Sequence, residues 1–207
     1  MITFFGSPMS SAGRTHWMLE EAGVPFEYKI VNVREGQHKT PELLAANPTG
    51  KIPAIVDGEL KLGESMAINL YIAEKYAPAT MPAEPGHRAK VYEWSFWAAT
   101  NLQPLLVDIV MHTMIFPEGQ RDASVVERAK AQVPRYLDVL EKALEGHEYL
   151  VSDHFTVADV NAASVVNLGA MVNVELGPNV KAWLDRMKAR PAYQRAMAAQ
   201  APAPTRA

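Results

Sequence analysis

The chain has 207 residues, enough for one large domain or two small ones with a substantial buried core. It carries 20 Lys and Arg against 23 Asp and Glu, a balance that excludes the basic face needed for nucleic-acid binding. It has no cysteine, which excludes disulfides, thiolate metal sites and a cysteine nucleophile, and we expect no metal site. The N-terminal residues lack the pattern of a signal peptide, and no apolar run approaches the roughly 20 residues that span a bilayer. We therefore expect a cytoplasmic protein with no membrane or nucleic-acid partner.

The N-terminal segment predicts a strand, a helix and a second strand. Ile2 to Phe5 is a short apolar strand, and the spacing after it predicts a helix from Ala12 to Ala22 that ends at Gly23. Phe26 to Val31 alternates as the next strand. A strand, helix and strand within about 30 residues form a βαβ unit, so these two strands should be parallel.

Two serines, Ser10 and Ser11, stand between the first strand and the first helix. A serine hydroxyl there can point into a cleft beside a helix N-terminus, where free N–H groups favour an anion. A thiol bound at that point is pushed toward the thiolate, because hydrogen bonding to the charged form lowers its pKa from about 8.5. The spacing leaves a second interpretation open, in which the serine only caps the helix.

A charged loop runs from Arg34 to Lys39 and precedes a short helix. Thr40 is the predicted N-cap of that helix, and Pro41 takes its first position. His38 and Lys39 lie just before this cap. Taken alone they indicate a solvated polar patch, but a cation at this point could also meet an anionic ligand.

The stretch from Asn47 to Ile68 organises the first half of the chain. It predicts a turn at 47–50, a strand from Ile52 to Val56, a hairpin turn at Asp57-Gly58 and a return strand at 60–62. Pro53 is unusual in a strand because it has no N–H to give to a ladder. Two interpretations are open. One is an ordinary trans proline on an edge strand, and the other is a cis peptide that leaves the N–H and C=O of Ile52 to pair with an extended peptide.

A domain boundary is expected soon after this stretch. Ser65 is the predicted N-cap of a helix that runs to Tyr76, and Glu64 precedes it. The following residues, 77–86, are rich in Pro and Ala and carry no periodic pattern, which predicts a linker. We therefore expect a first domain over residues 1–78 and a second over residues 87–207.

The second domain is helical by its apolar spacing. Its stretch around residue 112 is crowded with soft apolar side chains, namely Met111, Met114 and Phe116. A Met-rich surface adapts to varied apolar ligands, so these residues could form a pocket facing Met9 and Ser10. Ordinary packing between helices is the alternative interpretation.

Two further patterns in the second domain concern folding. Pro134 predicts a kink or a break in the helix from Ser124 to Leu144. Thr156 and Asp159 have the spacing of a capping box at the start of another helix. We assign Asp159 to the fold and not to chemistry.

Several of these motifs form one ordered set. The chain carries N-P-T-G-K-I-P-A-I and L-G-E-S-M-A-I, with H-K-T-P-E and G-S-P-M-S-S upstream. Their order resembles the glutathione site of the cytosolic glutathione transferases, and their spacing resembles the phi and related bacterial serine-type classes. The likeness runs through most of the chain. It implies an α/β N-terminal thioredoxin-like domain followed by an all-α C-terminal helical domain.

The resemblance also implies a role for each motif. In the phi-like pattern the catalytic serine, which stabilises the thiolate of glutathione, falls on Ser10, with Ser11 as the fallback. The loop cations face the glycine carboxylate, and the Glu-Ser pair meets the γ-glutamyl end. The implied glutathione-binding residues are Ser11, His38, Lys39, Lys51, Ile52, Pro53, Glu64 and Ser65. The second-substrate pocket would use Met9, Met111, Met114 and Phe116.

The implied protein is a homodimeric detoxification enzyme in which glutathione is a co-substrate and its thiolate attacks a hydrophobic electrophile. One rival hypothesis is another glutathione-dependent reaction, such as isomerisation, dehalogenation or peroxide reduction. The isomerase pattern Ser-Cys-Trp-Arg is replaced here by Ser11-Ala12-Gly13-Arg14, which argues against that reaction. The other rival is a binding protein that keeps the fold without the catalysis.

Overall fold

The structure is a computed structural model that describes residues 1–8 and 10–199. The chain divides into two compact units. Among the described residues, the first contains those of 1–81 and 189–199, and the second contains Pro82–Lys188.

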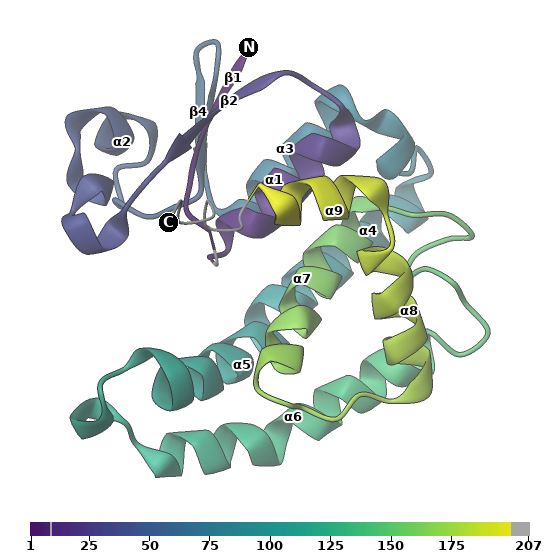
Figure 1. Ribbon diagram of the computed structural model, residues 1–207. Coiled ribbons are helices and arrows are strands. Elements are labelled where there is room, and N and C mark those ends of the chain that lie inside the picture. The colour runs from purple at the N-terminus through teal and green to yellow at the C-terminus, as the bar shows by residue number, and fades with distance from the viewer. Residues whose placement is uncertain (9, 200–207) are drawn as a thin grey trace, which may run out of the picture. The chain divides into compact units, whose positions relative to one another are not determined.

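The first unit is built on a four-stranded sheet in the order β2-β1-β3-β4. Figure 1 shows this sheet with the helices of the unit. The predicted parallel pairing of β1 with β2 is confirmed, while β3 runs antiparallel to both β1 and β4. The strands are β1 (Ile2–Gly6), β2 (Phe26–Ile30), β3 (Ala54–Asp57) and β4 (Leu60–Gly63). The helices of this unit are α1 (Ala12–Ala22), α2 (Pro41–Ala46), α3 (Ser65–Tyr76) and α9 (Pro191–Ala198), with short 3₁₀ turns at Val33–Glu35, Gln37–Lys39 and Pro78–Thr80.

The two faces of the sheet bury different side chains because successive residues of a strand point to opposite faces. Phe4 is fully buried and its ring lies 6.0 Å from the ring of His16 in α1. Its neighbour Phe5 belongs instead to a cluster with Leu43 and Ala46 of α2. The central strand therefore supplies apolar side chains to helices on both faces, and this fixes where the loop after β1 emerges.

The hairpin turn and the N-cap of α3 each lie one residue away from their predicted positions. Asp57 pairs with Leu60 in the hairpin, so the turn residues are Gly58 and Glu59, and Gly58 takes the positive φ of 61°. The N-cap of α3 is Glu64, and Ser65 is the first helical residue. Both shifts arise because the strand and helix hydrogen-bond patterns each take in one more residue than the apolar pattern indicated.

The second unit is helical. It contains α4 (Pro85–Trp97), α5 (Gln103–Val110), α6 (Ala123–Ala143), α7 (Val157–Met171) and α8 (Pro178–Lys188), with π-helical segments at Ala98–Leu102 and Met111–Ile115 and a 3₁₀ turn at Glu118–Gln120. Of the kink or break predicted at Pro134, the break is not found, because α6 continues through this residue as one helix of 21 residues. A proline removes only one backbone donor, and the apolar face of α6 is buried on both sides of it.

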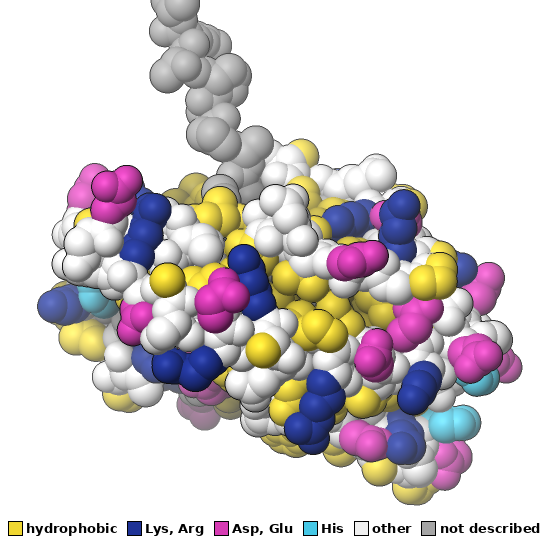
Figure 2. Space-filling view, turned by 90° about the horizontal axis from the view of Figure 1, so that it is seen from below, with side chains coloured by type: hydrophobic (Ala, Val, Ile, Leu, Met, Phe, Trp, Pro, Cys, Tyr) yellow, Lys and Arg dark blue, Asp and Glu magenta, His cyan; other side chains and the backbone are white. Residues whose placement is uncertain are grey.

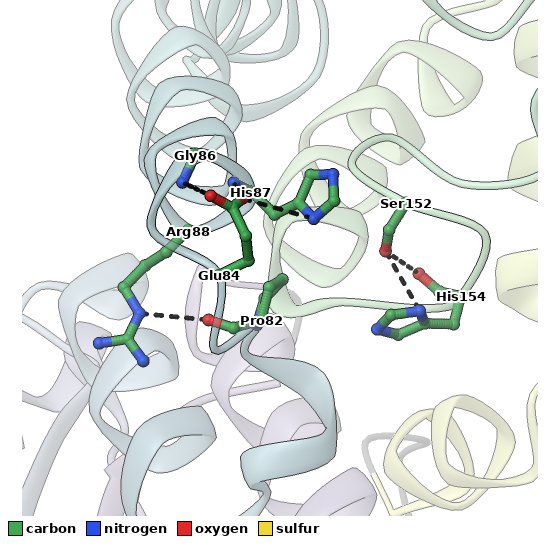
Figure 3. A network of polar contacts seen from close by, with 7 residues as sticks. All are labelled: Pro82, Glu84, Gly86, His87, Arg88, Ser152 and His154. Atoms are coloured by element: carbon green, nitrogen blue, oxygen red, sulfur yellow. Dashed lines mark hydrogen bonds and ion pairs between the residues drawn. The ribbon is translucent and has the colours of Figure 1, made fainter.

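The second unit begins with a side-chain cap on α4 (Figure 3). Both carboxylate oxygens of Glu84 accept hydrogen bonds from the first turn, one from the N–H of Gly86 at 2.8 Å and one from the N–H of His87 at 2.6 Å. These bonds lower the pKa of the Glu84 carboxyl. Arg88 donates back to the carbonyl of Pro82 at 3.2 Å, so the entry into α4 is held on both sides of the cap.

The predicted capping box at the start of α7 is confirmed. Asp159 is fully buried, and its carboxylate accepts hydrogen bonds from the N–H and hydroxyl of Thr156 at 2.9 and 3.1 Å. Its other oxygen accepts from the N–H of Leu150 at 3.1 Å and from the indole N–H of Trp183 at 2.9 Å. One side chain thus joins α7, α8 and the loop before α7.

Charged side chains of both signs are interspersed on the face drawn in Figure 2, so this face carries no continuous basic area. Within residues 1–8 and 10–199, no helix combines the length and apolar character that crossing a bilayer requires. The same residues contain no group of three or more His, Asp or Glu side chains placed to hold a metal ion.

Candidate functional site

Ser10 lies in the loop between β1 and α1, and its side chain is exposed. Its hydroxyl donates to the carbonyl of Ser7 at 2.7 Å and accepts a hydrogen bond from the N–H of Ala12 at 3.2 Å. The oxygen thus satisfies one of the free donors at the N-terminus of α1. The hydroxyl proton would have to rotate away from Ser7 to serve another acceptor, which costs only the exchange of one hydrogen bond for another.

Ser11 is placed differently from its neighbour. It is half-buried, makes no capping bond to α1, and its hydroxyl forms a long hydrogen bond of 3.5 Å to the carbonyl of Ile52. The two serines therefore make different contacts. Ser10 accepts a hydrogen bond from the first N–H of α1 and faces solvent, while Ser11, the N-cap residue, contacts the loop before β3.

The peptide bond between Ile52 and Pro53 is cis, so of the two interpretations left open by the sequence the cis form is the one found. Pro53 is buried, and β3 begins only at Ala54. Ile52 therefore stands outside the strand, half-buried, beside Ser11. A backbone segment in this position can pair with an extended peptide without competing with the sheet.

Glu64 and Ser65 form the second helix start of the site. Glu64 is exposed and adopts φ 62° and ψ 105°, a backbone conformation that non-glycine residues rarely take. Ser65 is half-buried in the first turn of α3, where backbone N–H groups have no partner inside the helix. Its carbonyl accepts a hydrogen bond of 3.5 Å from the hydroxyl of Thr15, one turn into α1. The two helix starts are therefore directly connected.

The cationic candidates lie on the loop between β2 and α2 and on the turn before Ile52. Lys39 and Lys51 are exposed, and His38 is half-buried. The Nδ1 atom of His38 is buried and has no hydrogen-bond partner among the residues that the structure describes. The His38 carbonyl lies 3.4 Å from the place where a Cβ atom on Gly50 would be, so this loop packs beside the turn that carries Lys51.

Two buried groups of α1 are set apart from this surface. Burial lowers the pKa of the Arg14 guanidinium to about 10. Burial also lowers the pKa of His16, although the nearby Glu20 carboxylate opposes the shift. His16 packs against the rings of Phe4 and Tyr28 and belongs to the core.

Comparison with known proteins identifies the family of this fold and site. Residues 1–74 match the model of the glutathione S-transferase N-terminal domain, and residues 102–191 match that of the C-terminal domain. The chain belongs to the glutathione S-transferase family. Both the family and the fold class expected from the sequence, a thioredoxin-like α/β domain followed by helices, are thereby confirmed.

Individual relatives cover almost the whole chain. Glutathione S-transferase 3 of Zea mays is 38% identical over 96% of this chain and 94% of its own length. The disulfide-bond oxidoreductase YfcG of Escherichia coli is 32% identical over 95% and 94%. A theta class glutathione S-transferase of Xanthomonas axonopodis, solved with glutathione bound, superposes with a TM-score of 0.85 at 34% identity, covering 95% of this chain and 96% of that one.

In this glutathione S-transferase the apolar candidates of the second unit gather around the π-helical segment Met111–Ile115. Met111 and Phe116 are half-buried, and Met114 exposes 49% of its surface. Neighbouring His112 accepts a hydrogen bond from the N–H of Asp122 at 2.9 Å, which ties the end of this segment to the start of α6. Met9 lies outside the described residues.

Sequence reasoning passed over two residues of the first unit. Thr15 was not singled out, although its hydroxyl connects α1 to the start of α3. Asn47 was interpreted only as part of a turn, although it is buried with 6% exposure. The signal that could have drawn attention to Asn47 is an amide side chain placed five residues before a strand-opening Ile-Pro pair.

Proposed function

We propose that this protein is a glutathione transferase that joins the thiolate of glutathione to hydrophobic electrophiles. The observation that carries the proposal is the arrangement of three features in one unit: an exposed serine at the start of α1, the cis Ile52–Pro53 junction, and the start of α3. The family membership and the glutathione-bound relative support the same ligand.

Glutathione carries a zwitterionic γ-glutamyl end and an anionic glycine end, and the candidate residues match both. The N–H and hydroxyl of Ser65 would bind the γ-glutamyl carboxylate at the start of α3, and the Glu64 carboxylate would bind the ammonium group. The cationic groups at the other end, His38, Lys39 and Lys51, would meet the glycine carboxylate.

The middle of the tripeptide would lie along Ile52, with its cysteinyl N–H and C=O paired to the backbone there. This extended pairing resembles the addition of one strand to a sheet edge. It would bring the cysteinyl sulfur toward the loop that carries Ser10 and Ser11, because Ser11 already contacts the Ile52 carbonyl.

The Ser10 hydroxyl would stabilise the sulfur as its thiolate. The thiol loses its proton to water, and the hydroxyl then donates to the charged sulfur, which lowers the thiol pKa. The polarised N-terminus of α1 acts in the same direction. The thiolate attacks the electrophilic carbon, a C–S bond forms, and the electron pair leaves with the leaving group or moves to a neighbouring electron-withdrawing atom. Holding both reactants together supplies the rest of the rate enhancement.

The hydrophobic electrophile would bind to soft apolar side chains, for which we propose Met9, Met111, Met114 and Phe116. We also propose a cytoplasmic homodimer, as is typical of the family. Phe96 on α4 exposes 63% of its surface, and a second copy of the chain would cover such a side chain. The domain extents proposed from the sequence, 1–78 and 87–207, would be tested by limited proteolysis.

The test combines a glutathione titration with a panel of electrophiles on the wild type, Ser10→Ala and Ser11→Ala. We expect Ser10→Ala to raise the pKa of bound glutathione and to lower kcat about 10- to 100-fold at neutral pH, while glutathione binding changes little. We expect a smaller effect from Ser11→Ala. Wild-type turnover in Ser10→Ala together with loss in Ser11→Ala would transfer the role to Ser11. Glutathione binding without turnover of any electrophile would favour a binding protein.

A second candidate is the reduction of disulfides by glutathione, which the similarity to the oxidoreductase YfcG favours. The chain has no cysteine, so the thiolate would have to come from glutathione. That thiolate attacks a disulfide sulfur and releases one thiol, and a second glutathione resolves the mixed disulfide and releases the other. Two glutathione molecules are thereby oxidised to their disulfide. Turnover of hydroxyethyl disulfide that exceeds turnover of every electrophile would establish this reaction as the main one.

A further inference from the structure

The side chain of Asn47 organises the loop that precedes the cis proline. Its Nδ2 donates to the carbonyl of Lys51 at 2.8 Å. Its Oδ1 accepts from the N–H and the hydroxyl of Thr49, at 3.2 and 2.8 Å. Its own carbonyl accepts from the N–H of Gly50 at 2.9 Å. The loop from Asn47 to Lys51 is therefore wound around one buried amide.

Gly63 encloses this amide from the side of the sheet. A Cβ atom on Gly63 would lie 2.8 Å from Nδ2 of Asn47 and 2.9 Å from its Cγ, closer than atoms of this kind approach. Gly63 faces Ala54 in the β3–β4 ladder. The Asn47 amide thus bonds to Lys51, the residue before Ile52. It also packs against Gly63, which pairs with the residue after Pro53.

The bond to Lys51 has a direct consequence for Ile52. The carbonyl of Lys51 and the N–H of Ile52 belong to the same planar peptide unit, and they point in opposite directions because this peptide is trans. Holding the carbonyl with Nδ2 of Asn47 therefore fixes the direction of the Ile52 N–H. A turn held by its own backbone alone would leave that peptide plane free to rotate.

We propose that Asn47 is a positioning residue for the tripeptide, which aims the Ile52 N–H at the ligand backbone by holding the Lys51–Ile52 peptide plane. The inference rests on the proposed function, because it takes the partner of the Ile52 N–H to be the cysteinyl unit of glutathione. Asn47 itself would not contact the ligand, because it is buried and acts through the loop.

The substitution Asn47→Asp tests this assignment with a side chain of nearly the same shape. An aspartate keeps an acceptor for Thr49 but has no N–H for the Lys51 carbonyl. Thr49→Val is the matched control, because it removes the hydroxyl bond to the same amide and leaves the bond to Lys51. Gly63→Ala is a second, independent variant that displaces the Asn47 amide and removes no polar group from it.

We expect Asn47→Asp and Gly63→Ala to raise the KM for glutathione and its Kd by calorimetry about tenfold. At saturating glutathione, kcat should stay within about twofold of the wild-type value, because the lost interaction is shared by ground state and transition state. The pKa of the bound thiol should stay close to that in the wild type. Thr49→Val should bind glutathione like the wild type. A general loss of structure would lower kcat and the active fraction together.

The outcomes are distinguishable. A folded Asn47→Asp protein with the wild-type Kd overturns the inference, as does an effect of equal size in Thr49→Val. If Asn47→Asp does not fold, Gly63→Ala decides, and a wild-type Kd in that variant likewise overturns it. If the wild-type protein itself binds no glutathione, the proposed function fails first and this inference falls with it.

Discussion

The guanidinium of Arg190 donates two hydrogen bonds to the carboxylate of Glu21, at 2.6 and 2.9 Å, across 169 positions of the chain. The indole N–H of Trp17 donates to the same carboxylate at 2.9 Å. The Trp17 ring also meets the ring of Tyr193 edge to face at 5.0 Å. Through these contacts α9 is attached to α1, the helix whose N-terminus carries Ser10.

Removing one partner of this pair should destabilise the first unit. The Glu21 side chain is only 9% exposed, so Arg190→Ala would leave a carboxylate largely out of water. We expect the free energy of unfolding to fall by about 2 kcal/mol, measured by urea denaturation. The double variant with Glu21→Ala should lose less than the sum of the two single variants. Strict additivity would contradict a direct interaction.

A second prediction concerns Asp57 at the end of β3. Burial alone would raise its pKa, but hydrogen bonds from Lys75, Tyr71 and Tyr76, at 2.8, 2.5 and 2.6 Å, lower the pKa to about 2. Because the pKa is lower in the folded state than the usual 3.8, this contribution to stability is present above about pH 4 and is lost as the pH falls toward 2.

Asp57→Asn should therefore be less stable than the wild type at pH 7 by about 1–2 kcal/mol, after allowance for solvent screening. The difference should shrink as the pH falls from 4 to about 2, which thermal denaturation over a pH series would measure. Tyr76→Phe removes one donor and serves as the graded control. A stability difference independent of pH would rule out an ionised Asp57 as its source.

The unfavourable backbone conformation of Glu64 can be tested separately from its carboxylate. Its φ of 62° is unfavourable for any residue with a Cβ atom, and glycine adopts it freely. We expect Glu64→Gly to be more stable than Glu64→Ala by about 1 kcal/mol in thermal unfolding. Both variants should bind glutathione less tightly, because both lack the carboxylate that we propose to bind the ammonium group. Wild-type affinity in Glu64→Gly would remove Glu64 from the proposed site.

Asp159 should affect stability and leave catalysis intact. In Asp159→Asn an NH₂ group replaces one carboxylate oxygen, so a donor would face donors that now bond to an acceptor. We expect a loss of about 2–4 kcal/mol in the free energy of unfolding, because the group is fully buried. At a temperature where the variant stays folded, its kcat and KM should match those of the wild type. A selective fall in kcat would give Asp159 a part in the chemistry.

The sequence predicted much of the first unit because its signals are local. The helix from Ala12 to Ala22 has the predicted bounds, and the N-cap at Thr40 and the parallel pairing of the first two strands were also predicted correctly. Each depends on residues a few positions apart, or on a connection rule that needs no knowledge of packing. The cis form of Pro53 was left open, since sequence spacing alone does not distinguish it from a trans edge proline.

The contacts that the sequence did not reveal join residues far apart in the chain. In the sequence, Glu21 and Arg190 are two ordinary charged residues, and only the packing of α9 on α1 brings them together. The role of Asn47 depends on Gly63 approaching from another strand. Pro134 was interpreted by its local rule, whereas the burial of the surrounding helix decided the outcome. Tertiary packing overrode or completed the local signals in each case.

The docking of α9 makes the first unit discontinuous in the chain, and this has a consequence for biosynthesis. A ribosome releases residues 1–81 well before residues 189–198, and the whole helical unit is translated between them. The helical unit is continuous, so it can be completed while the first unit still awaits its final helix. A nascent chain stalled before Arg190 would therefore expose the Trp17 and Glu21 side of α1 to solvent.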